Sequence, residues 1–421
     1  MKSIFSFFAA IVAGCTLMAQ PMLSLPFLSD APMASLVQPA THAQFQSGQY
    51  GLVLNGGYEL GSNALTFQNI FLESGTITNE MKDRIIADME APTQLRLGLR
   101  LEGTLYGKIG KVPLSLSYRN QQVAWLNFGQ PHTLGLVLYG NVQYAGTEIS
   151  DQDVRYQLAS YQEIAVGSGY AFGKLSVGGR VKLLLGNAYS ELDPFSYSLL
   201  TESLGTQIDF SGNYALFQGS TTNTPVGVGL DLGLTYGTDS TWKVGVALND
   251  LGQIGWDGDV VSGNFDLEYE GFDVVEFASL ADGTNFIAAD TLRELVFPDT
   301  TVGRQVQTLP ARVMLHGQYR LGSNLIGASA ILGLTDVSIG QPSAMLNVMY
   351  QRSLFPFLNV GVNAFVGDIT RWGVGAMLSG NIDIGKIELG YIAQMENASG
   401  YVLPTSGQGA SWSLGLRIGL K

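Results

Sequence analysis

The sequence predicts an all-β fold, a transmembrane antiparallel β-barrel of about fourteen strands, within a range of about twelve to sixteen. Many segments alternate apolar and polar residues over about ten positions, the length of a tilted strand that crosses a bilayer. Charged residues make up only 14% of the chain, whereas 53 glycines, 18 tyrosines and 20 phenylalanines favour strands. After Gln20, no apolar run reaches about 20 residues, the length of a membrane-spanning helix.

The first residues, 1–19, have the pattern of a signal peptide. Lys2 precedes an apolar stretch from Ile4 to Ala19, and cleavage is expected after Ala19. One alternative stays open, because the tetrapeptide "VAGC" that ends at Cys15 resembles a lipobox, in which the cysteine is lipidated. Both routes export the protein, and we expect it in the outer membrane of a Gram-negative cell, surrounded by outer-membrane lipid.

Residues 20–47 are irregular and contain four prolines before the first strand. Proline lacks a backbone donor and disfavours regular structure. A segment of this kind, next to a barrel, is able to fold inward and to satisfy its backbone with lumen polar groups and water. We therefore expect residues 20–47 to form a hatch, or plug, and residues 48–421 to form the barrel.

The stretch from Lys174 to Ala188 shows the strand alternation. Val181 and Leu183 share one face, and Arg180 and Lys182 share the other. The apolar face suits lipid, and the charged face suits a lumen that contains water. We accordingly expect that replacing Lys182 with leucine leaves folding largely intact. The same alternation recurs in residues 93–103, 311–321, 386–396 and 411–421.

Two further segments depart from the strand pattern. Residues 78–89 place apolar side chains at helical spacing after Thr78, a residue type that caps helices, and predict a short amphipathic helix. Residues 250–299 contain twelve acidic residues against a single base, Arg293. A stretch this polar does not cross lipid, and we expect a long acidic external loop at 250–308.

Basic side chains and one histidine on the lumen faces are the candidates for a ligand path, and Arg417 also faces inward. Two interpretations are open. The charges form a salt-bridged network that fills the interior, or they form a basic path that steers an anionic amphiphile. The candidates are Arg96, Arg100, Arg180, Lys182, Arg312, His316 and Arg320.

The chain lacks the patterns of a catalytic, metal or cofactor site. No GxSxG or HExxH occurs, and the three histidines (His42, His132 and His316) are far apart in the sequence. The single cysteine excludes an intrachain disulfide, and the net charge of -13 argues against a nucleic-acid partner. We predict no catalytic residues, no metal and no cofactor, and expect that the protein is not an enzyme.

Two motifs carry a resemblance to a known family. A strand motif, "GLDLGLTY", contains Asp231, and the motif "DLGQIGW" follows after a hairpin. The chain resembles an uncharacterised outer-membrane barrel family of Gram-negative bacteria that is related to the long-chain fatty-acid transporter (FadL) group. That group carries Asn-Pro-Ala in an N-terminal hatch, where this chain has Gln38, Pro39 and Ala40. The second motif contains Asp250, Leu251, Gly252 and Trp256.

The resemblance implies FadL-like transport of hydrophobic or amphipathic small molecules across the outer membrane. An alternative is an interaction barrel without transport, whose loops dock a secretion or surface partner, as in the FadL-like attachment protein of type IX secretion. A third alternative is an outer-membrane enzyme that modifies lipids. A lumen with a lateral opening would favour transport, whereas a filled lumen with an ordered protruding loop would favour docking.

Overall fold

The computed structural model describes residues 23–28, 30–46, 49–70, 78–204, 207–237, 241–269, 299–335, 344–367 and 369–420. Strands dominate this part of the chain, which confirms the all-β prediction. The expected signal peptide at 1–19 lies outside the described residues. The strands are β1 (Tyr50–Ser62), β2 (Thr93–Ile109), β3 (Val112–Phe128), β4 (Glu148–Phe172), β5 (Leu175–Thr201), β6 (Ile208–Gly219), β7 (Val226–Gly237), β8 (Trp242–Tyr269), β9 (Asp299–Thr308), β10 (Arg312–Leu321), β11 (Asn324–Gly333), β12 (Ala344–Phe355), β13 (Leu358–Gly367), β14 (Trp372–Ile384), β15 (Ile387–Asn397) and β16 (Gly409–Leu420).

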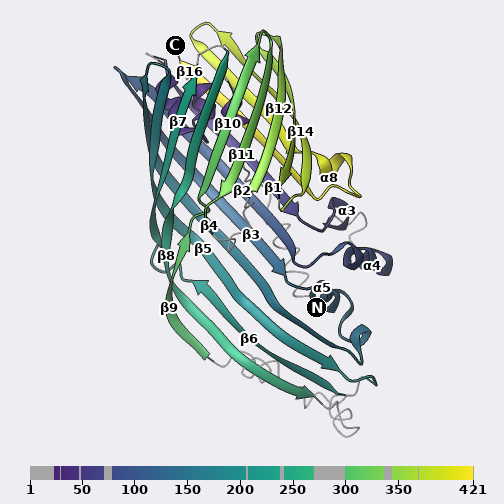
Figure 1. Cartoon of the computed structure of the whole chain (residues 1–421). Helices are drawn as coiled ribbons and strands as arrows, with labels where there is room; N and C mark the ends of the chain where they lie inside the picture. Colours follow the sequence, from purple (N-terminus) through teal and green to yellow (C-terminus); the bar gives the residue numbers. More distant parts are fainter. Residues whose placement is uncertain are drawn as a thin grey trace.

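These strands close into an antiparallel barrel (Figure 1). β16 pairs with β1, and β8 pairs with β10, so the ring has no free edge. β6 and β9 pair only with the far parts of β5 and β8, outside the ring. The sixteen described strands less these two leave fourteen in the ring, as the sequence predicts.

Side chains alternate between the two surfaces of the barrel. Val181 on β5 is 67% exposed, whereas its neighbour Lys182 is 1% exposed and faces the lumen. Apolar side chains cover the outside, and charged and amide side chains lie inside, which is the arrangement of an outer-membrane barrel. No helix in the described part of the chain is long and apolar enough to cross a membrane.

One end of the barrel has short turns, and β16 ends there (Figure 1). β4 and β5 are joined by a two-residue turn in which Gly173 has a φ of 62°, a conformation that glycine adopts at little cost. Exposed aromatic residues gather at this end, where a bilayer surface favours them. They include Tyr50, Phe172, Tyr236, Trp242, Tyr319 and Phe357.

At the other end, a curved sheet extends beyond the ring (Figure 1). β4, β5 and β8 have 25, 27 and 28 residues, far more than a membrane crossing needs, and β6 and β9 pair with their outer parts. The loop expected at 250–308 is therefore wrong at both ends, because residues 250–269 and 299–308 are strands. Their acidic side chains are compatible with strands because this sheet lies beyond the membrane span. Residues 270–298 lie outside the described part.

Short helices lie at the same end of the barrel as the extension (Figure 1): α3 (Phe67–Ile70), α4 (Asn79–Asp88), α5 (Pro131–Tyr139), the 3-10 turn η3 (Val142–Tyr144) and α8 (Ser399–Val402). α4 confirms the predicted helix. The Thr78 hydroxyl accepts a hydrogen bond from the Met81 backbone N–H at 3.3 Å, which caps the first turn. Ile85 of α4 and Leu138 of α5 belong to one apolar cluster, which joins the two helices.

Candidate functional site: the lumen and its plug

The N-terminal segment fills the lumen, as the sequence predicts for a plug. The plug comprises η1 (Leu25–Phe27), α2 (Ala31–Ala34) and η2 (Pro39–Gln44) with their connections. η2 packs against β4, β5 and β7 near the short-turn end. Almost every described residue from 23 to 45 is buried, so the plug has little contact with solvent.

Three glycines on neighbouring strands form the surface on which the plug rests. Gly169 on β4 pairs with Gly178 on β5, which pairs with Gly233 on β7. A Cβ added at Gly178 would lie 2.9 Å from the Ala40 Cα, and one at Gly233 would lie 2.7 Å from the Ala40 backbone N. Real Cβ atoms do not approach this closely. We call Gly169, Gly178 and Gly233 the glycine seat, because only glycine allows the plug backbone this near.

Gln38 links the plug to the barrel beside the seat. Its Nε2 donates to the Val246 carbonyl oxygen at 3.2 Å and lies 2.9 Å from Nε2 of His316. Its Oε1 accepts from the Ala40 backbone N–H at 3.3 Å, which caps the start of η2. The glutamine amide therefore serves both the helix and the barrel. Pro39 and Ala40 lie directly on the glycine seat.

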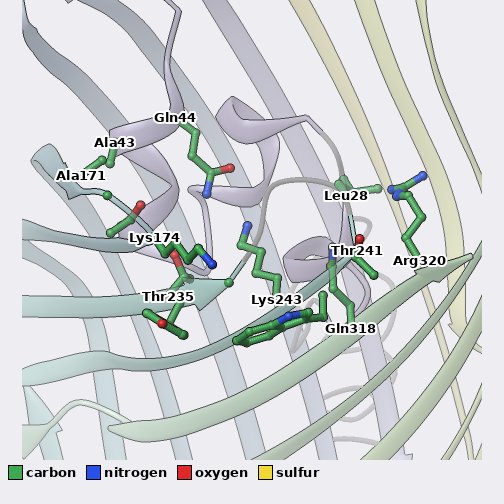
Figure 2. Close-up of a pocket in the computed structure, with 15 residues that line it drawn as sticks. Leu28, Ala43, Gln44, Ala171, Lys174, Thr235, Thr241, Lys243, Gln318 and Arg320 are labelled. Atoms are coloured by element: carbon green, nitrogen blue, oxygen red, sulfur yellow. The ribbon is translucent and has the colours of Figure 1, made fainter.

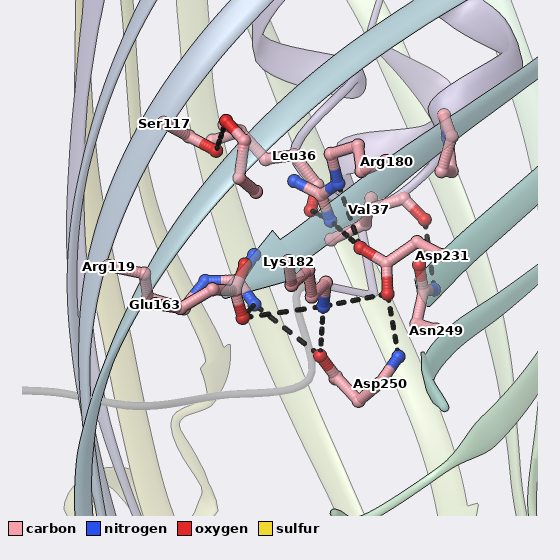
Figure 3. Close-up of polar contacts among 12 residues, drawn as sticks. Leu36, Val37, Ser117, Arg119, Glu163, Arg180, Lys182, Asp231, Asn249 and Asp250 are labelled. Atoms are coloured by element: carbon pink, nitrogen blue, oxygen red, sulfur yellow. Dashed lines mark hydrogen bonds and ion pairs between the residues drawn. The ribbon is translucent and has the colours of Figure 1, made fainter. Parts of the chain in front are cut away.

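Barrel side chains also bind the carbonyl groups of the plug. Arg180 donates to the Leu36 carbonyl oxygen at 2.9 Å, and Asn249 donates to the Val37 carbonyl oxygen at 3.0 Å (Figure 3). Arg417 holds α2 from another direction, because its Nε donates to the Asp30 carboxylate at 2.5 Å. These bonds supply partners for plug groups that have none in regular structure.

A buried network of charges lies beneath the plug on one side of the lumen (Figure 3). Lys182 is its centre, with its Nζ 2.6 Å from Asp250, 2.7 Å from Asp231 and 3.3 Å from Glu163. Charges removed from water require such partners. We call the set the ion network, and it comprises Arg100, Glu102, Arg119, Glu163, Arg180, Lys182, Asp231, Asp250 and Arg312.

A β-bulge brings Asp250 into this network. The pairing of β7 with β8 shifts at Asp231, which faces two residues, Asn249 and Asp250. Asp250 has a φ of 60°, and its backbone N–H donates to the Asp231 carboxylate at 2.7 Å. Two consecutive side chains of β8 therefore face the lumen, which strict alternation forbids.

The opposite side of the lumen carries a cluster of apolar side chains, interspersed with buried polar groups such as Asn347, Asn363 and Gln394. Phe27, Met33 and other plug residues contact inward-facing side chains of β10 to β15 in one buried cluster. Four of the wall residues are methionines, which adapt their shape readily. We call these wall residues the apolar wall: Met314, Leu325, Ile331, Met345, Met349, Phe365, Met377 and Ile392.

The seven ligand-path candidates fall into separate places. Arg100, Arg180, Lys182 and Arg312 join the ion network, and His316 contacts Gln38. Arg96 lies apart, 3.7 Å from Glu59, and Arg320 lines a cavity at the short-turn end. Sequence reasoning missed Arg119 and Glu163. Both occupy inward positions of alternating strands. The sequence around Arg119 shows this alternation, because the apolar residues Leu116 and Tyr118 occupy outward positions of the same strand.

The five motif residues also have different surroundings. Asp231 and Asp250 belong to the ion network, whereas Leu251 is exposed on the outer face. A Cβ at Gly252 would lie 2.7 Å from the Gly229 Cα, so glycine permits the close strand contact there. Trp256 is fully buried in the extension, where it stacks on Tyr189 at 5.4 Å and donates to Gln307 at 3.0 Å.

Several solved structures are similar to this chain at low sequence identity. A Pseudomonas aeruginosa FadL homologue is 12% identical, with 95% of this chain and 96% of that chain covered and a TM-score of 0.49. The Ralstonia pickettii toluene transporter TbuX is 10% identical, with 93% of each chain covered and a TM-score of 0.46. The P. putida toluene transporter TodX is 11% identical, with 92% of each chain covered and a TM-score of 0.41.

Among proteins with curated functions, none matches the sequence. The family of unknown function DUF5723 matches residues 39–389, which is well over half of the chain. The match begins within the plug, at the second residue of the Gln38-Pro39-Ala40 element, and extends into β15. The protein is therefore a member of the family of unknown function DUF5723.

Proposed function

We propose that this protein is an outer-membrane channel for hydrophobic or amphipathic small molecules, exported by the signal peptide at 1–19, with the plug as its gate. The observation that carries the proposal is the apolar wall under the plug. A plug that served only to close a polar pore would not require an apolar lumen wall. When the plug leaves, the methionines and other apolar side chains of this wall offer an adaptable surface to an apolar molecule.

The charged side of the lumen also supports the proposed channel. Arg100 and Arg180 both donate to the Leu36 carbonyl oxygen of the plug. Departure of the plug would free these donors, and they would face the apolar wall from across the lumen. An amphipathic molecule with an acidic head meets complementary groups for both of its ends. This is the role that we propose for the basic residues of the ligand path.

The glycine seat allows a test of the gate. Gly178→Val places side-chain atoms where the Ala40 Cα lies, so we expect the plug to leave its seat. Single-channel conductance in planar bilayers and uptake of a radiolabelled fatty acid by cells should both rise. Deletion of residues 20–43 should raise conductance in the same way. Heat-dependent electrophoretic mobility would verify that the variant barrel is folded.

Gly317→Val is the matched control. Gly317 lies on the outer face of β10, where an added Cβ would meet Val244 at an ordinary 3.6 Å. We expect wild-type conductance from this variant. A folded Gly178→Val barrel that stays as closed as the wild type, together with a closed deletion variant, would contradict the gate.

The extension favours a second candidate function, a barrel that docks a partner without transport. Its sheet projects beyond the ring and has an aromatic core of its own, which includes Tyr197, Phe210 and Phe265. A folded projection of this kind suits recognition at the cell surface. Loss of a surface phenotype on trimming β6 and β9, with fatty-acid uptake unchanged, would favour this candidate over the channel.

A further inference from the structure

A cavity of about 430 Å³ opens at the short-turn end, between the plug and the barrel (Figure 2). It is separate from the ion network and is lined by residues of β4, β5, β7, β8 and β10 together with Leu28, Ala43 and Gln44 of the plug. Its volume falls within the range of about 300–1,000 Å³ that is common for small-molecule sites.

Three cations line this cavity, and no aspartate or glutamate among the described residues does. They are Lys174, Lys243 and Arg320. Figure 2 shows the ammonium groups of Lys174 and Lys243 directed into the same space, close to the Gln44 amide, with Arg320 on the far side of Leu28. Like charges that converge in this way repel each other unless an anion lies between them.

The cations of this cavity differ from those of the ion network in the partners that surround them. There, Lys182 has three carboxylates within 3.3 Å. Among the described residues, no side chain forms a hydrogen bond or ion pair with the ammonium of Lys174 or Lys243 or with the guanidinium of Arg320. Lys243 is half-buried, so water solvates its charge only in part. A partner from outside the described chain would stabilise it.

The neutral lining residues suit an organic ligand. Gln318 carries a buried side-chain oxygen that makes no hydrogen bond within the described chain, an acceptor for a ligand hydroxyl or for water. Leu28, Ala43 and Ala171 add apolar surface. The lining combines convergent cations, amides and a few apolar groups, a combination that recognises a charged head with a short organic part.

We propose that this cavity is a binding site for an organic anion with a carboxylate or phosphate group, held chiefly by Lys174 and Lys243. The site does not depend on the proposed channel, because it exists with the plug in place. An occupant would contact both the barrel and Gln44 of the plug. It would therefore link the plug to the barrel at the short-turn end.

The test is isothermal titration calorimetry on the full chain in an uncharged detergent, with octyl phosphate, inorganic phosphate and octyl glucoside as probes. We expect octyl phosphate to bind and octyl glucoside not to bind. Combined Lys174→Gln and Lys243→Gln replacements should weaken octyl phosphate binding at least about tenfold. Lys111→Gln is the matched control, an exposed lysine in the turn after β2, and should leave binding unchanged.

Equal affinity for the two phosphates would support the site and assign it to a soluble anion, whereas tighter octyl phosphate binding would assign it to an amphiphile. Absence of binding, or equal weakening by Lys111→Gln, would overturn the proposal. Asp239 follows β7 in the sequence, outside the described residues. Binding that occurs only in an Asp239→Asn variant would overturn the proposal too, since the protein would then supply its own anion. These measurements do not include conductance, so they test the anion site independently of the proposed channel.

Discussion

The two sides of the lumen hold the same plug by different means. The ion network binds it through directed bonds, such as the one from Arg180 to the Leu36 carbonyl oxygen at 2.9 Å. The apolar wall contacts it through methionine and other apolar side chains, which impose no direction. The difference indicates that different side chains determine the position of the plug and its freedom to move. The charged side fixes where the plug lies through directed bonds, and the side chains of the apolar wall add contact area without fixing a direction.

This comparison predicts unequal sensitivity to substitution. A buried charge tolerates the loss of a partner poorly, because the remaining charge is left without water. Apolar packing tolerates changes that conserve volume. The outer face of the barrel provides a third environment, in which the penalty comes from lipid rather than from the plug. Substitutions on adjacent residues can therefore separate the three effects.

The largest effect is expected for Lys182→Met, which removes the cation shared by Asp231, Asp250 and Glu163. The free energy of unfolding should fall by about 3–5 kcal/mol. The sequence alone predicts that an apolar residue at 182 leaves folding intact, and the three carboxylates around Lys182 are the reason for the different expectation here. Urea unfolding in lipid vesicles measures the change, with Lys111→Met as the exposed control. A loss no greater than in the control would show that the network does not stabilise the barrel.

A smaller effect is expected one residue away, on the outer face. Val181→Arg places a charge in lipid near the middle of the crossing part of β5, at a cost of about 2–4 kcal/mol. Val142 in η3 is 76% exposed and lies outside the barrel, so Val142→Arg should change little. The same unfolding assay compares the two variants. Equal behaviour of the two would mean that Val181 does not face lipid.

The smallest effect is expected on the apolar wall. Met349→Leu conserves volume against the plug and should cost less than about 1.5 kcal/mol. Conductance and unfolding should both resemble the wild type. If Met349→Leu lowered the free energy of unfolding as much as Lys182→Met, the apolar wall would tolerate substitution no better than the ion network. That result would contradict the proposed difference between the two sides.

Local patterns in the sequence predict a large part of this architecture. Alternation assigns Arg180 and Lys182 to the lumen and Val181 to the outside, because the side chains of a strand alternate whatever its neighbours are. Helical spacing and the Thr78 cap likewise place α4. The plug was predictable as well, since its four prolines lack backbone donors and disfavour a strand.

The same reasoning fails where the position of a residue depends on a neighbouring strand. The acidic stretch at 250–308 looks like a loop by composition, but β6 pairs with residues 258–269 and makes them a strand. The sequence likewise does not reveal the partners of Asp250, because the direction of its side chain depends on the bulge opposite Asp231. Hydrogen-bond register between strands is a long-range property, and composition within one segment does not contain it.

The sequence by itself determined which side chains of the regularly alternating strands face lipid and which face the lumen, how the plug segment differs from the strands, and that the lumen is charged. These properties follow from periodicity and composition within single segments. Only the tertiary structure decided that Gly169, Gly178 and Gly233 meet as a seat, that the residues of the ion network come together, and that four methionines belong to the apolar wall. Those arrangements arise when strands far apart in the chain pair in one register, and the closed ring fixes that register for all of them at once.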